Sequence, residues 1–186
     1  MAAEVGRRKI VNVLDAAHPC PPAVQASSTR LAAIVILGRV PYDKYQGVDA
    51  WGGIYTAQDP DPDVNEHRTF ACAHAIGDHF ACVTHLATDT ETALTQCKAL
   101  MFDAVAYLKS VAGASGKKIV GGDLNLKYDT TSRHNVQNRV PNGYTRKGDG
   151  DVQHVTFSND ITSEATHNFP MRRTDHPGFL VQLFKP

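Results

Sequence analysis

The sequence lacks an excess of charge of either sign. Its 186 residues include 19 Lys and Arg against 19 Asp and Glu, so the formal net charge at pH 7 is zero. Tight binding along a nucleic acid needs an excess of positively charged residues. The balance of charges therefore excludes nucleic-acid binding by the whole protein surface and is compatible only with a local basic patch. A substrate is therefore expected to be short or small rather than a long duplex.

Long apolar runs are absent as well. No stretch approaches the roughly 18 residues of a membrane span, and the apolar residues 10–14 are too short for the core of a signal peptide. We therefore expect a cytoplasmic protein. Hydrophobic residues still make up 42% of the chain and charged residues 20%, which permits a buried core and argues against disorder. The length predicts one domain over residues 1–186, in which residues 1–30 are atypical.

The cysteines show no Cys-x-x-Cys spacing, which argues against a zinc knuckle. There are four of them: Cys20, Cys72, Cys82 and Cys97. Cys72 and Cys82 can face each other across a predicted hairpin if its register allows, so a disulfide is one alternative. Because the cytoplasm is reducing, buried thiols are the expected state.

The order of the predicted strands is typical of an α/β fold. The apolar run 31–37 predicts a strand buried on both faces. Segments 68–76 and 79–86 flank a tight Gly-Asp turn and predict a β-hairpin. Segments 152–158 and 178–184 predict two further strands near the C-terminus.

One helix is predicted between the strands 79–86 and 118–122. Thr88 and Glu91 have the spacing of a capping box, and Gly113 predicts the end of the helix. The residues between them form an apolar stripe at helical spacing: Leu94, Cys97, Met101, Ala104, Val105 and Leu108. A strand, a helix and a strand within about 40 residues make a βαβ unit, so the two strands should be parallel neighbours in one sheet.

One long polar segment, 126–151, is predicted to be a loop. It is rich in Asn, Arg, Lys, Asp and Gly and shows no periodicity, and a loop of this length in a compact domain is usually functional or mobile. Its basic residues are most simply solvated, with substrate contact as the alternative: Arg133, Arg139, Arg146 and Lys147.

Polar side chains stand where the predicted strands of the βαβ unit end. His85 ends the first strand, Asp123 and Asn125 end the second, and Asp175 and His176 come just before the last strand of the chain. Parallel strands of such a unit deliver their C-terminal ends to one edge of the sheet, where open sheets place their sites. Each residue also has a structural alternative, as a histidine at a strand end or as an Asp or Asn in a turn.

Taken in order, these segments resemble the endonuclease/exonuclease/phosphatase superfamily, which has the deoxyribonuclease I-like fold. The matching segments are Thr84–Leu86, a helix that carries Gln96, Gly121–Asn125 and Thr174–Pro177. The resemblance covers roughly Leu31 to the C-terminus. It implies a four-layered α/β sandwich that is shortened at its N-terminus, and it implies hydrolysis of phosphodiesters or phosphomonoesters with a divalent cation.

The resemblance also implies a role for each residue at the edge. Asp123 would orient or deprotonate the attacking water, Asn125 would hold the phosphoryl oxygens, and His85 would stabilise the pentacovalent transition state. Asp175 and His176 would complete the metal and acid–base set. Mg²⁺ or Mn²⁺ would be held by oxygens of Asp123, Asn125 and Asp175, the ligand type that such cations prefer. The set would supply charge neutralisation, an activated water and a protonated leaving group.

Three further residues are candidates for substrate binding. Arg172 and Arg173 stand beside the Asp-His pair and are expected either to contact a phosphate or to be solvated. Tyr55, like Trp51, is expected either to stack on a base or to fill the core.

The sequence departs from the family pattern in two places. Asn12 can stand for the asparagine of the family, but Ala26 occupies the position of its metal-binding glutamate, and the only glutamate before position 60 comes too early in the chain. Gln153 stands where the family has an aspartate paired to the last histidine. Asp149 or Asp151 is the candidate to compensate for that missing charge.

Two functions therefore remain open. The first is a divalent-metal-dependent phosphoester hydrolase, most simply a small nuclease that cleaves a phosphodiester. The second is a repurposed scaffold without hydrolytic activity, acting as a biosynthetic enzyme or a binding protein, because the expected glutamate is missing and Gln153 carries no charge. Missing N-terminal strands would also uncover a sheet edge, which homodimerisation is one way to cover.

Overall fold

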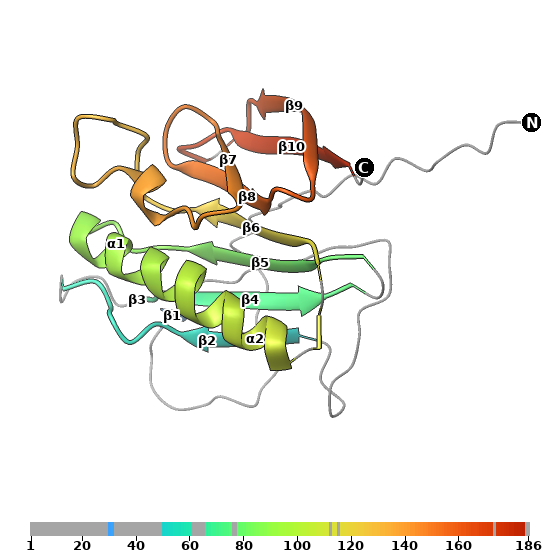
Figure 1. Cartoon of the computed structure of the whole chain (residues 1–186). Coiled ribbons are helices and arrows are strands. Elements are labelled where there is room, and N and C mark those ends of the chain that lie inside the picture. The colour runs from blue at the N-terminus through green and yellow to red at the C-terminus, as the bar shows by residue number, and fades with distance from the viewer. Residues whose placement is uncertain are drawn as a thin grey trace, which may run out of the picture.

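Figure 1 shows the computed structural model of the chain. The structure describes residues 30–31, 50–60, 66–75, 78–111, 113–114, 116–172 and 174–184. The predicted strand 31–37 lies outside these residues except for Leu31, which belongs to β1 (Arg30–Leu31) and pairs in parallel with β3 (Glu66–His67). The predictions made for residues 10–14, Asn12, Cys20 and Ala26 also lie outside the described residues.

A six-stranded mixed sheet is the centre of the fold. In spatial order, its strands are β2 (Ala50–Ile54), β4 (Thr69–His74), β5 (Phe80–His85), β6 (Lys118–Asp123), β8 (Gln153–Ser158) and β7 (Tyr144–Gly148). β5 and β6 run parallel, and the other neighbours in this sheet run antiparallel. The predicted hairpin (β4–β5) and the predicted βαβ unit (β5–β6) are both confirmed.

One long helical segment connects β5 to β6 and lies across the sheet (Figure 1). It consists of α1 (Thr90–Lys98), a π-helical stretch (Ala99–Ala104) and α2 (Val105–Val111). The predicted apolar stripe packs in the core against the sheet. The segment ends as predicted at Gly113, whose φ of +62° suits glycine, and the N–H of Ala114 bonds back to the carbonyl of Lys109 at 3.0 Å.

The start of this helix differs from the predicted capping box. Asp89 rather than Thr88 is the N-cap, and its carboxylate accepts the backbone N–H of Thr92 at 2.8 Å. Thr88 instead donates its hydroxyl to the carboxylate of Asp59 at 3.0 Å. Aspartate is among the preferred N-cap residues, and its negative charge is favourable at the positive end of the helix dipole.

The prediction of one long loop over 126–151 is wrong. The segment contains a 3₁₀ helix (Val136–Arg139) and the edge strand β7. A further strand, β9 (Thr162–Phe169), lies just before the predicted last strand, β10 (Gly178–Phe184), and pairs with it antiparallel. β7 and β9 were not predicted because they are polar on both faces and lack the apolar alternation on which sequence patterns depend.

Side-chain alternation along the strands separates two cores. Phe80 of β5 and Val120 of β6 face the helices and belong to the larger core. Ile119, one residue before Val120, faces the opposite way and packs with Phe157 of β8 and Val181 of β10. The β9–β10 pair therefore covers part of the sheet face opposite the helices. Apart from the short β1–β3 pair, the described elements form three layers: helices, the six-stranded sheet, and the β9–β10 pair.

The prediction of free thiols at Cys72 and Cys82 is wrong. The register of β4 and β5 places them directly opposite each other, with Cα atoms 4.0 Å apart, and they form a disulfide. Cys97 is buried and free. Disulfides persist mainly in oxidising compartments, so the cytoplasmic location remains a prediction without support from the cysteines. Among the helices that the structure describes, none is long and apolar enough to cross a membrane.

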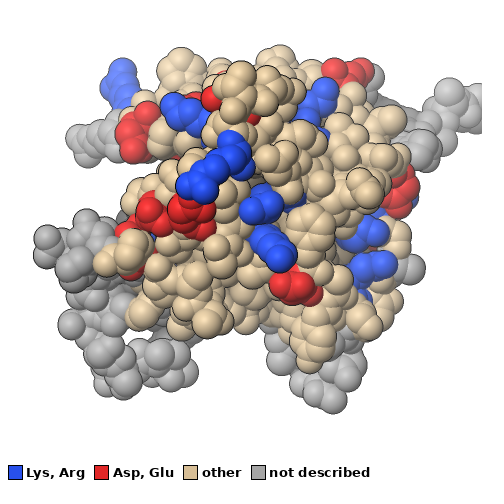
Figure 2. Space-filling model, turned by 60° about the vertical axis from the view of Figure 1, so that its left-hand side comes forward, with Lys and Arg blue, Asp and Glu red and all other residues tan. Residues whose placement is uncertain are grey.

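Charges of both signs are interspersed on the surface. In Figure 1 the C-terminal ends of β5 and β6 point to the left-hand side, and Figure 2 turns that side of the molecule forward. Lys and Arg side chains lie in the middle of this face with Asp and Glu side chains beside them (Figure 2). This mixture is what the zero net charge of the sequence leads one to expect.

Gly122 in β6 is a position at which the sheet leaves no space for a side chain. Its φ is +145°, and a Cβ there would lie 1.9 Å from the backbone oxygen of Thr84 on β5. We expect Gly122→Ala to lower the free energy of unfolding by about 3 kcal/mol or more, measured by urea denaturation. In the control Gly143→Ala, φ is +82° and nothing lies within 4 Å of the new Cβ, so the loss should be about 1 kcal/mol. Equal losses in the two variants would contradict this account.

Candidate active site

Three side chains form a row across the sheet. His85 of β5 pairs with Asp123 of β6, and Asp123 pairs with Gln153 of β8. Asp123 lies four residues after Ile119, so alternation puts it on the same sheet face as the smaller core, opposite the helices. The row stands at the C-terminal ends of the two parallel strands, the edge that the sequence predicts as the site.

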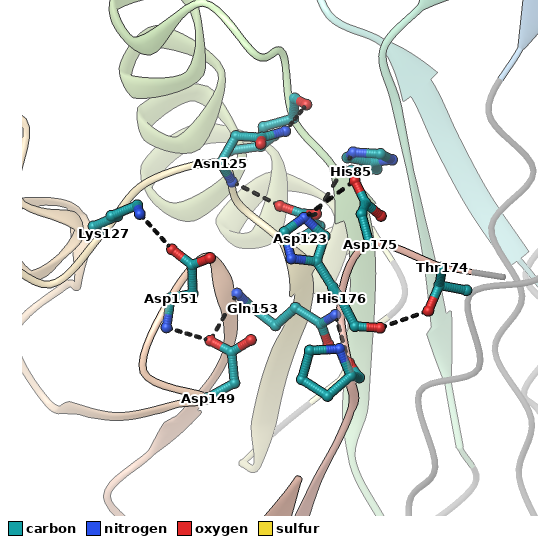
Figure 3. A network of polar contacts seen from close by, with 12 residues as sticks. His85, Asp123, Asn125, Lys127, Asp149, Asp151, Gln153, Thr174, Asp175 and His176 are labelled. Atoms are coloured by element: carbon teal, nitrogen blue, oxygen red, sulfur yellow. Dashed lines mark hydrogen bonds and ion pairs between the residues drawn. The ribbon is translucent and has the colours of Figure 1, made fainter. Parts of the chain in front are cut away.

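Asp123 is the centre of this row. Its side chain is 4% exposed, and its Oδ2 lies 3.8 Å from Nε2 of His85 and 3.7 Å from Nε2 of His176 (Figure 3). Its Oδ1 accepts the backbone N–H of Asn125 at 2.9 Å. Burial raises the pKa of Asp123, while the Asn125 N–H and the two imidazoles act against that rise. One carboxylate is thus shared by two imidazoles from distant parts of the chain.

Asn125 closes the turn that follows β6. Its φ is +49°, a conformation that Asn tolerates better than most residues, and no other non-glycine residue in the described ranges has a positive φ. Its side-chain amide donates to the carbonyl of Leu86 at 2.8 Å, which ties the turn to the residue after His85. The turn alternative for Asp123 and Asn125 is therefore confirmed, and this turn sets the position of the Asp123 carboxylate.

The connection between β9 and β10 brings in Asp175 and His176. Nε2 of His176 lies 3.6 Å from Oδ2 of Asp175, whose side chain is 91% exposed. Gln153 donates from its amide to the carbonyl of Pro177 at 2.8 Å. The neutral residue at position 153 thus holds the backbone next to His176 instead of supplying a charge to the imidazole.

The carboxylates beside His176 are those of Asp123 and Asp175, so the predicted compensation by Asp149 or Asp151 is not what the structure shows. The Asp149 carboxylate accepts the backbone N–H of Asp151 at 2.7 Å. Asp151 forms an ion pair with Lys127 at 2.8 Å. Figure 3 shows both aspartates on the β8 side of the row.

Gln96 supports the site from the helix side. Its side chain is fully buried, and its oxygen accepts the backbone N–H of Ala87 while its amide donates to the carbonyl of Ala57, both at 2.8 Å. Ala87 lies two residues after His85, so this glutamine fixes the chain where it leaves β5. Gln96 acts on the backbone and lies in the core rather than at the edge.

Of the residues predicted to bind substrate, Tyr55 lies in the core. Tyr55 is 4% exposed and belongs to the larger core, and its hydroxyl is 2.8 Å from Oγ1 of Thr84. Burial raises its pKa. Trp51 packs against Phe80 with ring centroids 6.3 Å apart. Core filling is therefore the alternative that fits both aromatic residues. Arg172 is exposed in the connection between β9 and β10, and Arg173 lies outside the described residues.

The donor chemistry at the edge suits a hard divalent cation in part. Asp123 and Asp175 offer carboxylate oxygens and Asn125 offers a carboxamide oxygen, the types that Mg²⁺ and Mn²⁺ prefer. In the part of the chain that the structure describes, however, no three His, Cys, Asp or Glu side chains are grouped as metal ligands. The residues fit a cation held by one or two carboxylates together with water and substrate phosphate, which is common for Mg²⁺. They do not fit a cage built from protein alone.

Solved structures share this fold. A TDP2 structure from Caenorhabditis elegans is 17% identical over 80% of this chain, with a TM-score of 0.53. An endonuclease/exonuclease/phosphatase from Bacteroides vulgatus is 12% identical over 75% of this chain, with a TM-score of 0.51. The chain spans 52% and 66% of these two structures. No protein-family model and no curated protein matches the sequence. The predicted deoxyribonuclease I-like α/β fold is confirmed.

Asp123 should destabilise the fold when it is ionised. Because burial raises its pKa above the ordinary value of 3.8, its contribution to stability is present below that pH and is lost as the pH rises through the folded-state pKa. We expect Asp123→Asn, which cannot ionise, to be more stable than the native protein at neutral pH without added cations. This advantage should grow with rising pH and then level off, in urea denaturation at several pH values.

Asp129→Asn is the control with the opposite sign. The Thr131 hydroxyl and N–H bind the Asp129 carboxylate and lower its pKa. Its charge therefore adds stability that is lost as the pH falls, and the substitution should bring no gain at neutral pH. An Asp123→Asn protein that is less stable than the native one at neutral pH would contradict the account.

Proposed function

We propose that this chain, which has the fold of the endonuclease/exonuclease/phosphatase structures, is a divalent-metal-dependent phosphoester hydrolase. The most direct form of the proposal is a small nuclease that cleaves a phosphodiester. One observation carries it: His85 and His176 both lie within 3.8 Å of one oxygen of the buried Asp123 carboxylate. These residues come from three distant segments, and neither core packing nor turn formation requires two imidazoles on one carboxylate.

The geometry assigns complementary roles to these side chains. A carboxylate whose pKa is raised by burial is a better general base for a water molecule than an ordinary aspartate. An imidazole in its protonated form can give a proton to the leaving oxygen or stabilise charge on the nonbridging phosphoryl oxygens. Asp123 orients both imidazoles, and Asp175 faces His176 from the solvent side. The Asn125 carboxamide is the neutral group proposed to contact a phosphoryl oxygen.

A divalent cation belongs to the proposal, with Asp123, Asn125 and Asp175 as the residues that would hold it. When bound, Mg²⁺ or Mn²⁺ would neutralise charge on the phosphate and lower the pKa of a bound water. The proposal assigns to Gln153 the task of keeping the backbone at Pro177 fixed, so that Asp175 and His176 stay at the edge.

The second candidate is a scaffold that binds a phosphoester or acts in biosynthesis without hydrolysing it. Two observations favour it: Gln153 carries no charge, and the described residues contain no complete group of metal ligands. Both candidates predict that a phosphate is bound at His85 and His176. They differ in whether the bound phosphoester is then hydrolysed.

We expect the purified protein to hydrolyse bis(p-nitrophenyl) phosphate with Mg²⁺ or Mn²⁺, measured by release of p-nitrophenolate. His85→Ala and Asp123→Ala should lower kcat/KM by about 100-fold or more, because each removes a group that acts on the reacting atoms. His134→Ala is the matched control, since His134 pairs with Glu91 of α1 on the helix side of the sheet, and its activity should be unchanged.

The proposal fails if the folded protein releases no product from this diester, nucleotides or oligonucleotides with either cation. Phosphate binding at His85 without turnover would instead select the second candidate. Equal losses in the His134 and His85 variants would move the reaction away from this edge of the sheet.

A further inference from the structure

Tyr128 is an exposed aromatic residue in the segment that follows β6. It follows Asn125 by three residues, and 55% of it is accessible to solvent. The guanidinium of Arg146 lies over its ring, 4.6 Å from the centroid. A tyrosine held against an arginine in this way presents a flat, polarisable surface to solvent, which is the kind of surface on which nucleic-acid bases stack.

Arg146 is held by two side chains. Its Nε donates to Oε1 of Gln137 at 3.1 Å, and its Nη1 lies 3.0 Å from Nδ1 of His154. His154 is 1% exposed, and its Nε2 is 2.7 Å from the carbonyl of Leu126. The carbonyl can only accept and the guanidinium can only donate, so Nε2 of His154 carries the proton and Nδ1 accepts. Burial lowers the pKa of His154, in agreement with this neutral form.

These contacts reach β8 next to the row of His85, Asp123 and Gln153, but from the helix side of the sheet, because successive residues of a strand face opposite ways. His154 directly follows Gln153, which pairs with Asp123 across the sheet. Lys127, which directly precedes Tyr128, pairs with Asp151 beside the row (Figure 3). We name Tyr128 and Arg146 the stacking pair. Its position is fixed by the same stretch of β8 that fixes Gln153.

The sequence segment that contains the stacking pair is richer in cations than the whole chain. The stretch 127–147 contains a single acidic residue, Asp129, and several cations: Lys127, Arg133, Arg139, Arg146 and Lys147. Lys127 is paired with Asp151 and Arg133 with Glu91, so the local excess of positive charge comes from Arg139, Arg146 and Lys147. A polyanion with exposed flat groups would match both the cations and the aromatic ring.

We propose that the stacking pair binds a base of a single-stranded nucleic acid, one of whose phosphates reaches His85 and His176. The proposal rests on the proposed function for the fate of that phosphate, but it concerns binding. A single strand is the fitting partner because its bases expose the faces that a duplex buries in its own stack. Tight binding of a duplex would also require a broad positively charged surface, which a chain of zero net charge does not provide.

The test is fluorescence anisotropy with a 5′-fluorescein-labelled dT12 strand at low salt. All measurements contain EDTA, so that the proposed metal-dependent cleavage does not interfere. We expect Tyr128→Ala to weaken binding by about 5- to 150-fold, the range for loss of one stacked base, and Tyr128→Phe to keep the affinity. Tyr107→Ala is the matched control, because Tyr107 is also exposed (68%) but lies on α2; its affinity should not change.

The binding result separates this inference from the proposed function. Unchanged affinity in Tyr128→Ala, an equal loss in Tyr107→Ala, tighter binding of a labelled duplex of the same length, or no binding of dT12 would each overturn the inference. If dT12 fails to bind while the native protein hydrolyses bis(p-nitrophenyl) phosphate, only the inference fails. If dT12 binds as expected and the native protein hydrolyses no diester, the inference about binding holds and the proposed reaction fails.

Discussion

The parallel pairing of β5 with β6 is the constraint on which the site depends. It places His85 beside Asp123 and buries a carboxylate that would be more stable in water. Two imidazoles and one backbone N–H offset part of that cost. A buried charge that is only partly compensated lowers the free energy of unfolding. Such a loss of stability is common at sites that catalyse a reaction or bind an anion.

The rest of the described structure holds the neighbours of that carboxylate in place. Gly122 lets β6 lie against β5 without a side chain between them. Gln96 fixes the chain after His85 from the helix side, and Gln153 fixes the backbone at Pro177 from β8. These two glutamines are neutral groups that position charged ones. Gln153 therefore brings no charge to the site, while its amide contacts the connection that carries His176.

Much of this could be predicted from sequence because it depends on local patterns. The hairpin, the helix and the βαβ unit follow from apolar alternation and helical spacing, and the edge that gathers His85 and Asp123 follows from the βαβ geometry. β7 and β9 could not be predicted, because their polar residues give no periodic signal. The Cys72–Cys82 disulfide depends on a hairpin register that the turn residues alone do not set. The stacking pair depends on the contact between Arg146 and buried His154, which no spacing in the sequence indicates.

The proposed function requires His85, Asp123 and His176 to act as one site that binds a phosphate together with a divalent cation. Isothermal titration calorimetry of Mn²⁺ into the protein, with and without inorganic phosphate, tests it most directly. We expect weak binding of the cation alone, tighter binding when phosphate is present, and loss of that gain in Asp123→Asn and in His176→Ala. A gain from phosphate that survives both substitutions, or no heat of binding in either condition, would contradict it.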